Sequence, residues 1–185
     1  MNSITLENPL AGVPDWILRP ALPEDEAQIR ALVQAEALNP TGIAFPTFHV
    51  VSVAGTIVGA AQIRRHRDGS REFGSLVVAP DFRGCGIGRA LIHALLARER
   101  GRLHVITSRH GAKTWERLGF RRVSGWAAPP SIRRNLLIGR AFGLLARLRG
   151  RRPLGLRVLE RPMLAGPFAQ PATSPAAMRV PQFNG

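Results

Sequence analysis

The sequence predicts an α/β protein in which a mixed, mostly antiparallel sheet is flanked by helices. Two observations carry this prediction. Short β-branched runs bounded by turn residues alternate with helical patterns, in the order strand, helix, three strands, helix, strand, helix, strand. Apolar residues make up 45% of the 185 residues, which suffices for the core of one domain and excludes wholesale disorder.

The first part of the chain is predicted to hold one helix and four strands. A strand over 16–19 precedes Pro23, a residue tolerated at the first helical position, and three acidic residues then favour the helix dipole. Apolar residues at helical spacing continue from Ile29 to Ala37, and Asn39–Pro40 ends this helix. Three further strands, separated by turn residues, are expected over 48–53, 57–63 and 72–78.

The rest of the chain continues this alternation of helices and strands. Ile87, Leu91 and Leu95 share one face of a helix predicted over 87–98. The remaining elements are expected as strands over 103–107, 120–123 and 156–159 and as helices over 112–118 and 132–149.

Charge divides the chain into segments. The formal net charge is +14, and the ten basic residues and one acidic residue of the last sixty positions supply +9 of it. We therefore expect a folded core over 1–125, a basic amphipathic helix with a last strand over 126–163, and a disordered, Pro-rich tail over 164–185.

Three interpretations of the basic C-terminal helix remain open. It packs on the core or on a second copy of the chain in a homodimer, which we favour; it lies on an anionic membrane surface; or it contacts nucleic acid through phosphates, the least favoured of the three. No apolar run in the sequence reaches the roughly 18–20 residues of a membrane span, and the N-terminus lacks the pattern of a secretory signal. A soluble, cytoplasmic protein is the expectation.

The loop after the fourth predicted strand carries the strongest functional signal. The strand over 72–78 runs into the glycine-rich segment Arg83–Gly88, which opens the next helix. Free backbone N–H groups at a helix N-terminus bind anions, and glycines allow a phosphate to approach closely. A Walker loop is excluded because no Gly-Lys-Ser/Thr follows, and the glycine spacing differs from a dinucleotide fingerprint. A glycine-rich turn without a ligand is the alternative.

With its Arg-x-x-Gly-x-Gly pattern between a strand and a helix, residues 16–125 resemble the GNAT superfamily of acetyl-CoA-dependent N-acetyltransferases. The element order and the segment Trp115–Phe120, similar to that family's later helix ending in Gly-Phe, agree with this resemblance. It implies that Leu76, Val77 and Val78 offer backbone hydrogen bonds to the pantetheine of coenzyme A. The residues implied to cradle the pyrophosphate and open the helix are Arg83, Gly84, Cys85, Gly86, Ile87, Gly88, Arg89 and Ala90.

A second, softer resemblance concerns an uncharacterised bacterial branch of this superfamily. That branch is similar to the N-acetylglutamate-synthase type of amino-acid acetyltransferase, and the match names no substrate. The segments that carry it are Asn39–Gly42, Phe48–Val51, Asp68–Glu72 and Pro129–Arg133.

Glu72 is the candidate catalytic residue. It lies at the start of the strand that leads to the loop, where many family members place a carboxylate base, and it would take the proton of the acceptor ammonium directly or through water. The alternative is a structural ion pair with a neighbouring arginine such as Arg71 or Arg65.

Two positions near the expected thioester depart from the family pattern. The chain contains no tyrosine, and Trp115 stands where the family usually has a tyrosine proton donor. Ser108 stands where many members have asparagine, and His110 is a reserve donor. An indole N–H donates a hydrogen bond without giving up a proton at neutral pH, and core packing is an equally good account of Trp115. The five histidines show no metal-binding spacing, so no metal is expected.

The function expected from this resemblance is N-acetyl transfer from acetyl-CoA to a primary amine of a small molecule, with an amino acid as one candidate. The alternative is a non-catalytic domain that binds coenzyme A or phosphate and is targeted to membrane or nucleic acid by its basic helix. Glu72 and the complete loop favour the enzyme, whereas the absent tyrosine favours the binding domain.

Overall fold

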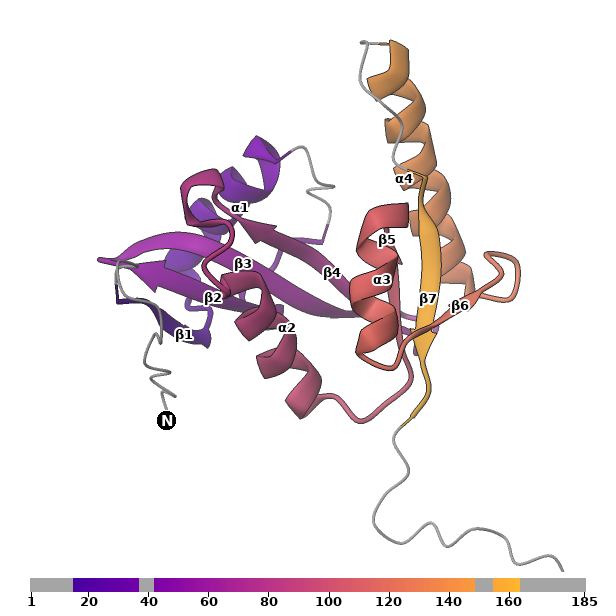
Figure 1. Cartoon of the computed structure of the whole chain (residues 1–185), viewed down its shortest axis with the longest axis horizontal. Coiled ribbons are helices and arrows are strands. Elements are labelled where there is room, and N and C mark those ends of the chain that lie inside the picture. Colours follow the sequence, from indigo (N-terminus) through magenta and orange to yellow (C-terminus); the bar gives the residue numbers. More distant parts are fainter. Residues whose placement is uncertain (1–14, 37–41, 149–154, 164–185) are drawn as a thin grey trace, which may run out of the picture.

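The computed structural model describes residues 15–36, 42–148 and 155–163, and these form a seven-stranded sheet with helices on both faces (Figure 1). The strand order is β1-β2-β3-β4-β5-β7-β6, and every neighbouring pair is antiparallel except β4 and β5, which are parallel. The strands are β1 (Ile17–Pro20), β2 (Phe48–Val53), β3 (Thr56–Arg65), β4 (Arg71–Val78), β5 (Leu103–Thr107), β6 (Arg121–Val123) and β7 (Arg157–Arg161). The predicted mixed, mostly antiparallel α/β fold is confirmed.

The helices also follow the predicted order. Short 3-10 turns precede α1, β2 and α2, and the α-helices are α1 (Glu26–Ala35), α2 (Ile87–Arg98), α3 (Arg109–Arg117) and α4 (Pro130–Leu148). The bounds of β2, α2 and β5 equal the predicted ones, because turn or cap residues flank each of these segments. The expected ending of α1 at Asn39–Pro40 and the expected disordered tail over 164–185 lie outside the described residues.

Neighbouring residues of one strand pack on opposite faces of the sheet. Val51 and Leu159 belong to the core cluster under α2 and α3. Val50 packs with Ile29 and Val33 of α1, and Val158 packs with α4. Because side chains alternate along a strand, α2 and α3 cover one face, whereas α1 and α4 cover the other.

A β-bulge opposite β3 and the early separation of β4 from β5 set the geometry of β4. Between the pairs Gln62–Gly74 and Ala60–Val77, β4 has two residues where β3 has one. Ser75, one of these two, has a φ of 52°. The extra residue reverses the alternation, so that Phe73 packs on the α2 face and Val77 on the α1 face. On its other side β4 pairs with β5 only at Glu72 and Phe73. The following residues of β4 therefore form a strand edge that points toward the gap between the two diverging strands.

Helix α4 packs on the sheet through one side only. Ile132 and Leu136 are buried against Ala128 and Val158, whereas Leu137 and Leu144 on the outer side are more than half exposed. In Figure 1 the last turns of α4 rise beyond the end of the sheet. None of the helices within the described ranges combines the length and the apolar character needed to cross a membrane.

Candidate active site

The loop between β4 and α2 presents backbone N–H groups at a helix start. Gly84 and Gly86 have φ values of 84° and 79°, a left-handed conformation that glycine adopts without strain. Gly86 is the N-cap of α2, and its carbonyl accepts the first helical hydrogen bond, from the N–H of Ala90, at 2.9 Å. Helical geometry leaves the N–H groups of Ile87, Gly88 and Arg89 without intrahelical partners, so this end of α2 is suited to an anion.

Arg83 ties the loop to its surroundings. Its Nε donates to the carbonyl of Val78 at 3.1 Å, and its guanidinium forms an ion pair with Glu36, just after α1. The loop is thus held against both the end of β4 and the end of α1. Cys85 is half-buried, and its Sγ lies 3.8 Å from the carbonyl oxygen of Arg83, which agrees with a loop-filling role for this thiol.

The strand edge and the loop are continuous. Leu76 and Val78 are half-buried on the α2 face, and Val77 is buried on the α1 face. Leu76 is the second residue of the bulge, and Val77 and Val78 pair with Ala60 and Gly59 of β3; beyond Phe73 none of them pairs with β5, so their other backbone edge faces the gap beside that strand. An extended molecule lying in this gap would pair with the edge and bring its anionic end to the start of α2.

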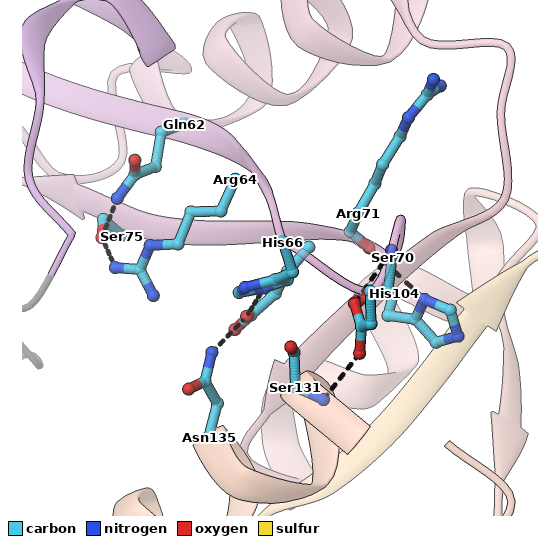
Figure 2. A network of polar contacts seen from close by, with 11 residues as sticks. Gln62, Arg64, His66, Ser70, Arg71, Ser75, His104, Ser131 and Asn135 are labelled. Carbon is cyan, nitrogen blue, oxygen red and sulfur yellow. Dashed lines mark hydrogen bonds and ion pairs between the residues drawn. The ribbon is translucent and has the colours of Figure 1, made fainter. Parts of the chain in front are cut away.

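Glu72 lies on the α1–α4 face, next to the bulge, and is 5% exposed. Its Oε2 accepts a hydrogen bond from Asn135 Nδ2 of α4 at 2.6 Å and lies 2.8 Å from Nε2 of His66, which follows β3 (Figure 2). Arg71, one of the expected ion-pair partners, is paired with Glu99 instead. The carboxylate is therefore oriented by contacts with Asn135 and His66, rather than by an ion pair with Arg71.

A second polar group lies beside Glu72 on the same face. Figure 2 shows Gln62 and Arg64 converging on Ser75, the bulged residue of β4. The Arg64 guanidinium donates to Ser75 Oγ at 2.7 Å, and with its amide oxygen facing them the buried Gln62 accepts from both Ser75 and Arg64. Burial lowers the pKa of Arg64, which the neighbouring Glu72 carboxylate partly opposes.

Arg64 has no direct ion-pair partner in the described part of the chain, since no carboxylate there lies within salt-bridge distance of it. A half-buried guanidinium without a direct carboxylate partner is costly, because the nearby Glu72 charge offsets its desolvation only in part. The arrangement can therefore receive a small anionic group close to the bulge.

The two positions expected near the thioester have structural roles. Ser108 caps α3, and its Oγ accepts a hydrogen bond from the N–H of Gly111 at 3.1 Å. Trp115 is 5% exposed and packs edge-to-face on Phe73 and Phe120, with ring centroids 4.7 and 5.1 Å away. Among the described residues, no group of three or more His, Cys, Asp or Glu side chains is arranged to hold a metal ion.

The comparison with protein families agrees with this geometry. Residues 45–122, which run from just before β2 to β6, match the family model of the acetyltransferase (GNAT) domain. Over these residues the chain is similar to a GNAT acetyltransferase domain. The match includes β4, the glycine loop and α2, and thus the whole strand–loop–helix unit described above.

The GNAT fold of this chain recurs in solved structures. N-acetylglutamate synthase from Neisseria gonorrhoeae, complexed with coenzyme A and N-acetyl-glutamate, matches with a TM-score of 0.60 and 20% identity over 81% of this chain and 35% of that chain. Rv2747 from Mycobacterium tuberculosis, in complex with CoA and NLQ, matches with a TM-score of 0.59 and 23% identity over 80% of this chain and 99% of that chain. Ard1 from Thermoplasma volcanium matches with a TM-score of 0.55 and 15% identity, over 82% and 99% of the two chains.

These likenesses describe the fold. The chain spans about a third of the length of the Neisseria synthase chain that it matches, and no curated protein matches its sequence.

Sequence reasoning missed several polar residues that surround Glu72. Gln62 is the single polar residue of the apolar run Ile57–Ile63, which is a signal that one side of this strand lines a polar site, whereas Arg64 and His66 stand in a continuous polar run and carried no separate signal. Asn135 carried no such signal, because its position in α4 gains meaning only once α4 packs beside β4.

Proposed function

We propose that this protein is an N-acetyltransferase that moves the acetyl group of acetyl-CoA to a primary amine of a small molecule. The observation that carries the proposal is the continuity of the open edge of β4 with the glycine loop at the start of α2. That edge suits the amides of an extended pantetheine arm, and the helix start suits the pyrophosphate at the other end of the same cofactor. The match to the GNAT domain family supports this assignment.

The proposed binding site uses mainly backbone groups. Leu76, Val77 and Val78 pair with the pantetheine, and Gly84 and Gly86 leave room for phosphate oxygens. Arg83 holds the loop against Val78 and Glu36, and its half-exposed guanidinium remains within the loop that receives the phosphates. The other members of the proposed cradle are Cys85, Ile87, Gly88, Arg89 and Ala90.

Glu72 is the proposed general base. Acetyl transfer forms a bond between the amine nitrogen and the acetyl carbon and breaks the bond from that carbon to sulfur. The amine must first lose its ammonium proton, and Glu72 would take that proton directly or through water. His66 and Asn135 both contact Oε2, which leaves Oε1 free to face the acceptor. The thiolate leaves without a tyrosine donor, because a thiol pKa of about 8.5 makes it a tolerable leaving group near neutral pH.

Arg64 supports an acceptor that carries a carboxylate, such as an amino acid. Its guanidinium lies beside the bulge, on the same face as Glu72, and its direct hydrogen bonds are to uncharged groups. A carboxylate of the acceptor would pair with Arg64 while its amine faced Glu72. Because the two charges lie on adjacent, directly paired residues of β3 and β4, they match the opposite charges of a zwitterionic amino acid.

Release of free thiol from acetyl-CoA in the presence of a pool of amines and amino acids tests the proposed reaction. We expect release that depends on the amine and that is lost in Gly86→Asp, because the new carboxylate would repel the pyrophosphate. Gly86→Asn is the matched control, since it has the same shape and the same left-handed backbone without the charge. Tight binding of acetyl-CoA with no thiol release for any amine would instead indicate the non-catalytic binding domain.

Arg64→Met tests the acceptor carboxylate. We expect KM for the best amino acid to rise roughly 10- to 150-fold, the loss of a hydrogen bond to a charged group, while KM for acetyl-CoA stays constant. The matched control is the corresponding amine without its carboxylate, which the variant and the wild-type protein should use equally poorly. Equal KM values for the amino acid in both proteins would remove Arg64 from acceptor binding and leave acetyl transfer itself in place.

A further inference from the structure

The outer side of α4 combines exposed apolar side chains with arginines. Arg133, Leu137, Arg140 and Leu144 follow one another at i, i+4, i+7 and i+11, so they form one narrow stripe along the helix. Leu137 is 63% exposed and Leu144 is 61% exposed. Packing on the sheet accounts for Ile132 and Leu136 on the inner side, and leaves the outer stripe without a partner among the described residues.

A surface groove runs along the base of this stripe. Its volume is about 660 Å³, and Trp126, in the loop before α4, is 85% exposed at its rim. Three guanidinium-bearing residues, Arg133, Arg134 and Arg140, line the groove together with Leu137. The lining of the groove therefore combines apolar side chains with three cationic ones.

The segment of chain that carries this surface has charge of a single sign. From Arg117 through Leu159 the sequence contains eleven arginines and neither aspartate nor glutamate, and Asp68, from the turn before β4, adds a carboxylate at the start of α4. The stripe and groove belong to this stretch. Any partner must thus supply negative charge for the arginines and, at the same time, an apolar phase for Trp126 and the two leucines.

We propose that the outer side of α4 lies on the surface of an anionic phospholipid bilayer. Lipid phosphates would pair with Arg133, Arg134 and Arg140, and Leu137 and Leu144 would enter the upper acyl region. Arginine places its charged end in the headgroup layer while its aliphatic stem lies along apolar groups, so alternation of arginine and leucine on one stripe suits such an interface. An exposed tryptophan prefers the same depth.

A second copy of the chain fits this surface less well. In a symmetric dimer the same patch faces itself, which would bring the arginines of the stripe against one another, and the stripe itself holds no carboxylate. A nucleic acid would neutralise the arginines, but it would leave the two exposed leucines in water. The bilayer alone satisfies both the charge and the apolar side chains. This inference is independent of the proposed acetyl transfer.

Co-sedimentation of the full chain with lipid vesicles tests the proposal. We expect binding to vesicles of phosphatidylcholine mixed with phosphatidylserine, weakening with added salt, and no binding to pure phosphatidylcholine. The variant Arg133→Ala/Arg134→Ala/Arg140→Ala should lose binding on the order of a hundredfold, since each arginine near an anionic surface contributes about a factor of five. The matched control, Arg100→Ala/Arg102→Ala/Arg109→Ala, removes the same charge from exposed positions elsewhere and should lose less than about fivefold.

Tryptophan fluorescence gives a second readout. Of the three tryptophans, Trp16 and Trp115 are buried, so acrylamide quenching reports mainly on Trp126. Vesicles containing phosphatidylserine should protect Trp126 from the quencher, and Leu137→Ser/Leu144→Ser should weaken binding at unchanged charge and unchanged melting temperature. Equal losses in the two arginine triples, or no vesicle binding at all, would overturn the proposal. So would a dimer that the leucine variant dissociates, or binding to RNA or DNA without binding to vesicles.

Discussion

At the scale of single residues, the environment of Glu72 decides what that carboxylate can do. It is buried, and it has no arginine in direct contact; its Oε2 is held by Asn135 and His66. A carboxylate neutralised by an arginine would be a weak base, because the ion pair favours the ionised form. The observed partners orient the carboxylate through hydrogen-bond contacts to a single oxygen, Oε2.

Glu72→Gln should lower turnover about 10²–10⁴-fold at pH 7, because the amide cannot take the proton of the acceptor ammonium. The loss should shrink at high pH, where the free amine is already neutral, and affinity for acetyl-CoA should barely change. Steady-state kinetics across pH, with calorimetry of acetyl-CoA binding, measure both effects. The fold should persist, since the amide oxygen still accepts from Asn135 and His66.

Glu99→Gln is the matched control for Glu72. Glu99 is equally buried, but it pairs with Arg71 and with the N–H of Gly101, away from the loop and the bulge. We expect this variant to be less stable and to turn over normally. Wild-type turnover in Glu72→Gln at pH 7 would reassign Glu72 to a structural role.

At the scale of elements, the start of α1 shows how a helix without a good cap is held in place. Leu22 stands where a capping side chain is expected, and the buried carboxylate of Asp25 compensates. It accepts from the backbone N–H of Leu22 at 2.8 Å and from both terminal nitrogens of Arg19 at 2.6 and 3.0 Å. These bonds hold α1 against β1. Helix α1 in turn contributes Val33 to the core, and Glu36, just after its last turn, pairs with Arg83 of the glycine loop.

Asp25→Asn should destabilise the protein by about 1.5–3 kcal/mol at pH 7, the range for hydrogen bonds to a charged group. The hydrogen bonds from Arg19 are the largest cause of a lowered pKa for Asp25. A lowered folded-state pKa contributes stability above the unfolded value of about 3.9, and that contribution is lost as pH falls below it. The free energy of unfolding, measured with urea from pH 7 to pH 2, should therefore fall less with acid in Asp25→Asn than in the wild-type protein.

Glu26→Gln provides the control for this acid limb. Glu26 forms an exposed ion pair with Arg30 one helical turn away, at 3.1 Å, and such pairs contribute about 0.3–0.5 kcal/mol. Its loss should leave stability and its pH dependence nearly unchanged. If the free energy of unfolding fell equally with acid in the wild-type protein and in Asp25→Asn, Asp25 would have an ordinary pKa in the folded chain.

At the scale of the whole molecule, the C-terminal part of the described chain completes the sheet. β7 lies between β5 and β6, with Leu159 buried on the α2 face and Val158 on the α4 face. Helix α4 adds Ile132 and Leu136 to the same cluster as Val158 and brings Asn135 to Glu72. A chain that ended at 125 would lack the strand that joins β6 to the rest of the sheet.

Removal of residues 126–185 should make the protein aggregate, or lower its melting temperature steeply. Four buried apolar side chains of α4 and β7 would be lost, each stabilising by about 1.5–3 kcal/mol, against a total stability of about 5–15 kcal/mol for a typical domain. The measurement is solubility and thermal unfolding by circular dichroism. Removal of residues 164–185 alone is the control and should leave the melting temperature unchanged. A soluble 1–125 fragment with the wild-type melting temperature would contradict this role of α4 and β7.

The order of the elements and the glycine loop follow from the sequence alone, because both are local. Helical and strand periodicities, turn residues and the run of glycines after 78 act over a few neighbours, and they placed β2, α2 and β5 to the residue. Glu72 became the candidate base through the resemblance to the GNAT superfamily, because many members place a carboxylate near the start of the strand that enters the loop.

The partners of these groups were decided only by the tertiary structure. Asn135 meets Glu72, and Asp68 accepts from the N–H of Ser131 at 2.9 Å at the start of α4, each across 63 residues of sequence. The carboxylate at the start of α4 thus comes from the turn between β3 and β4, far away in the sequence. Insertion of β7 between β5 and β6 is likewise non-local. Local patterns state which face of an element is apolar, but only packing of distant segments determines which polar side chains meet beside the bulge of β4.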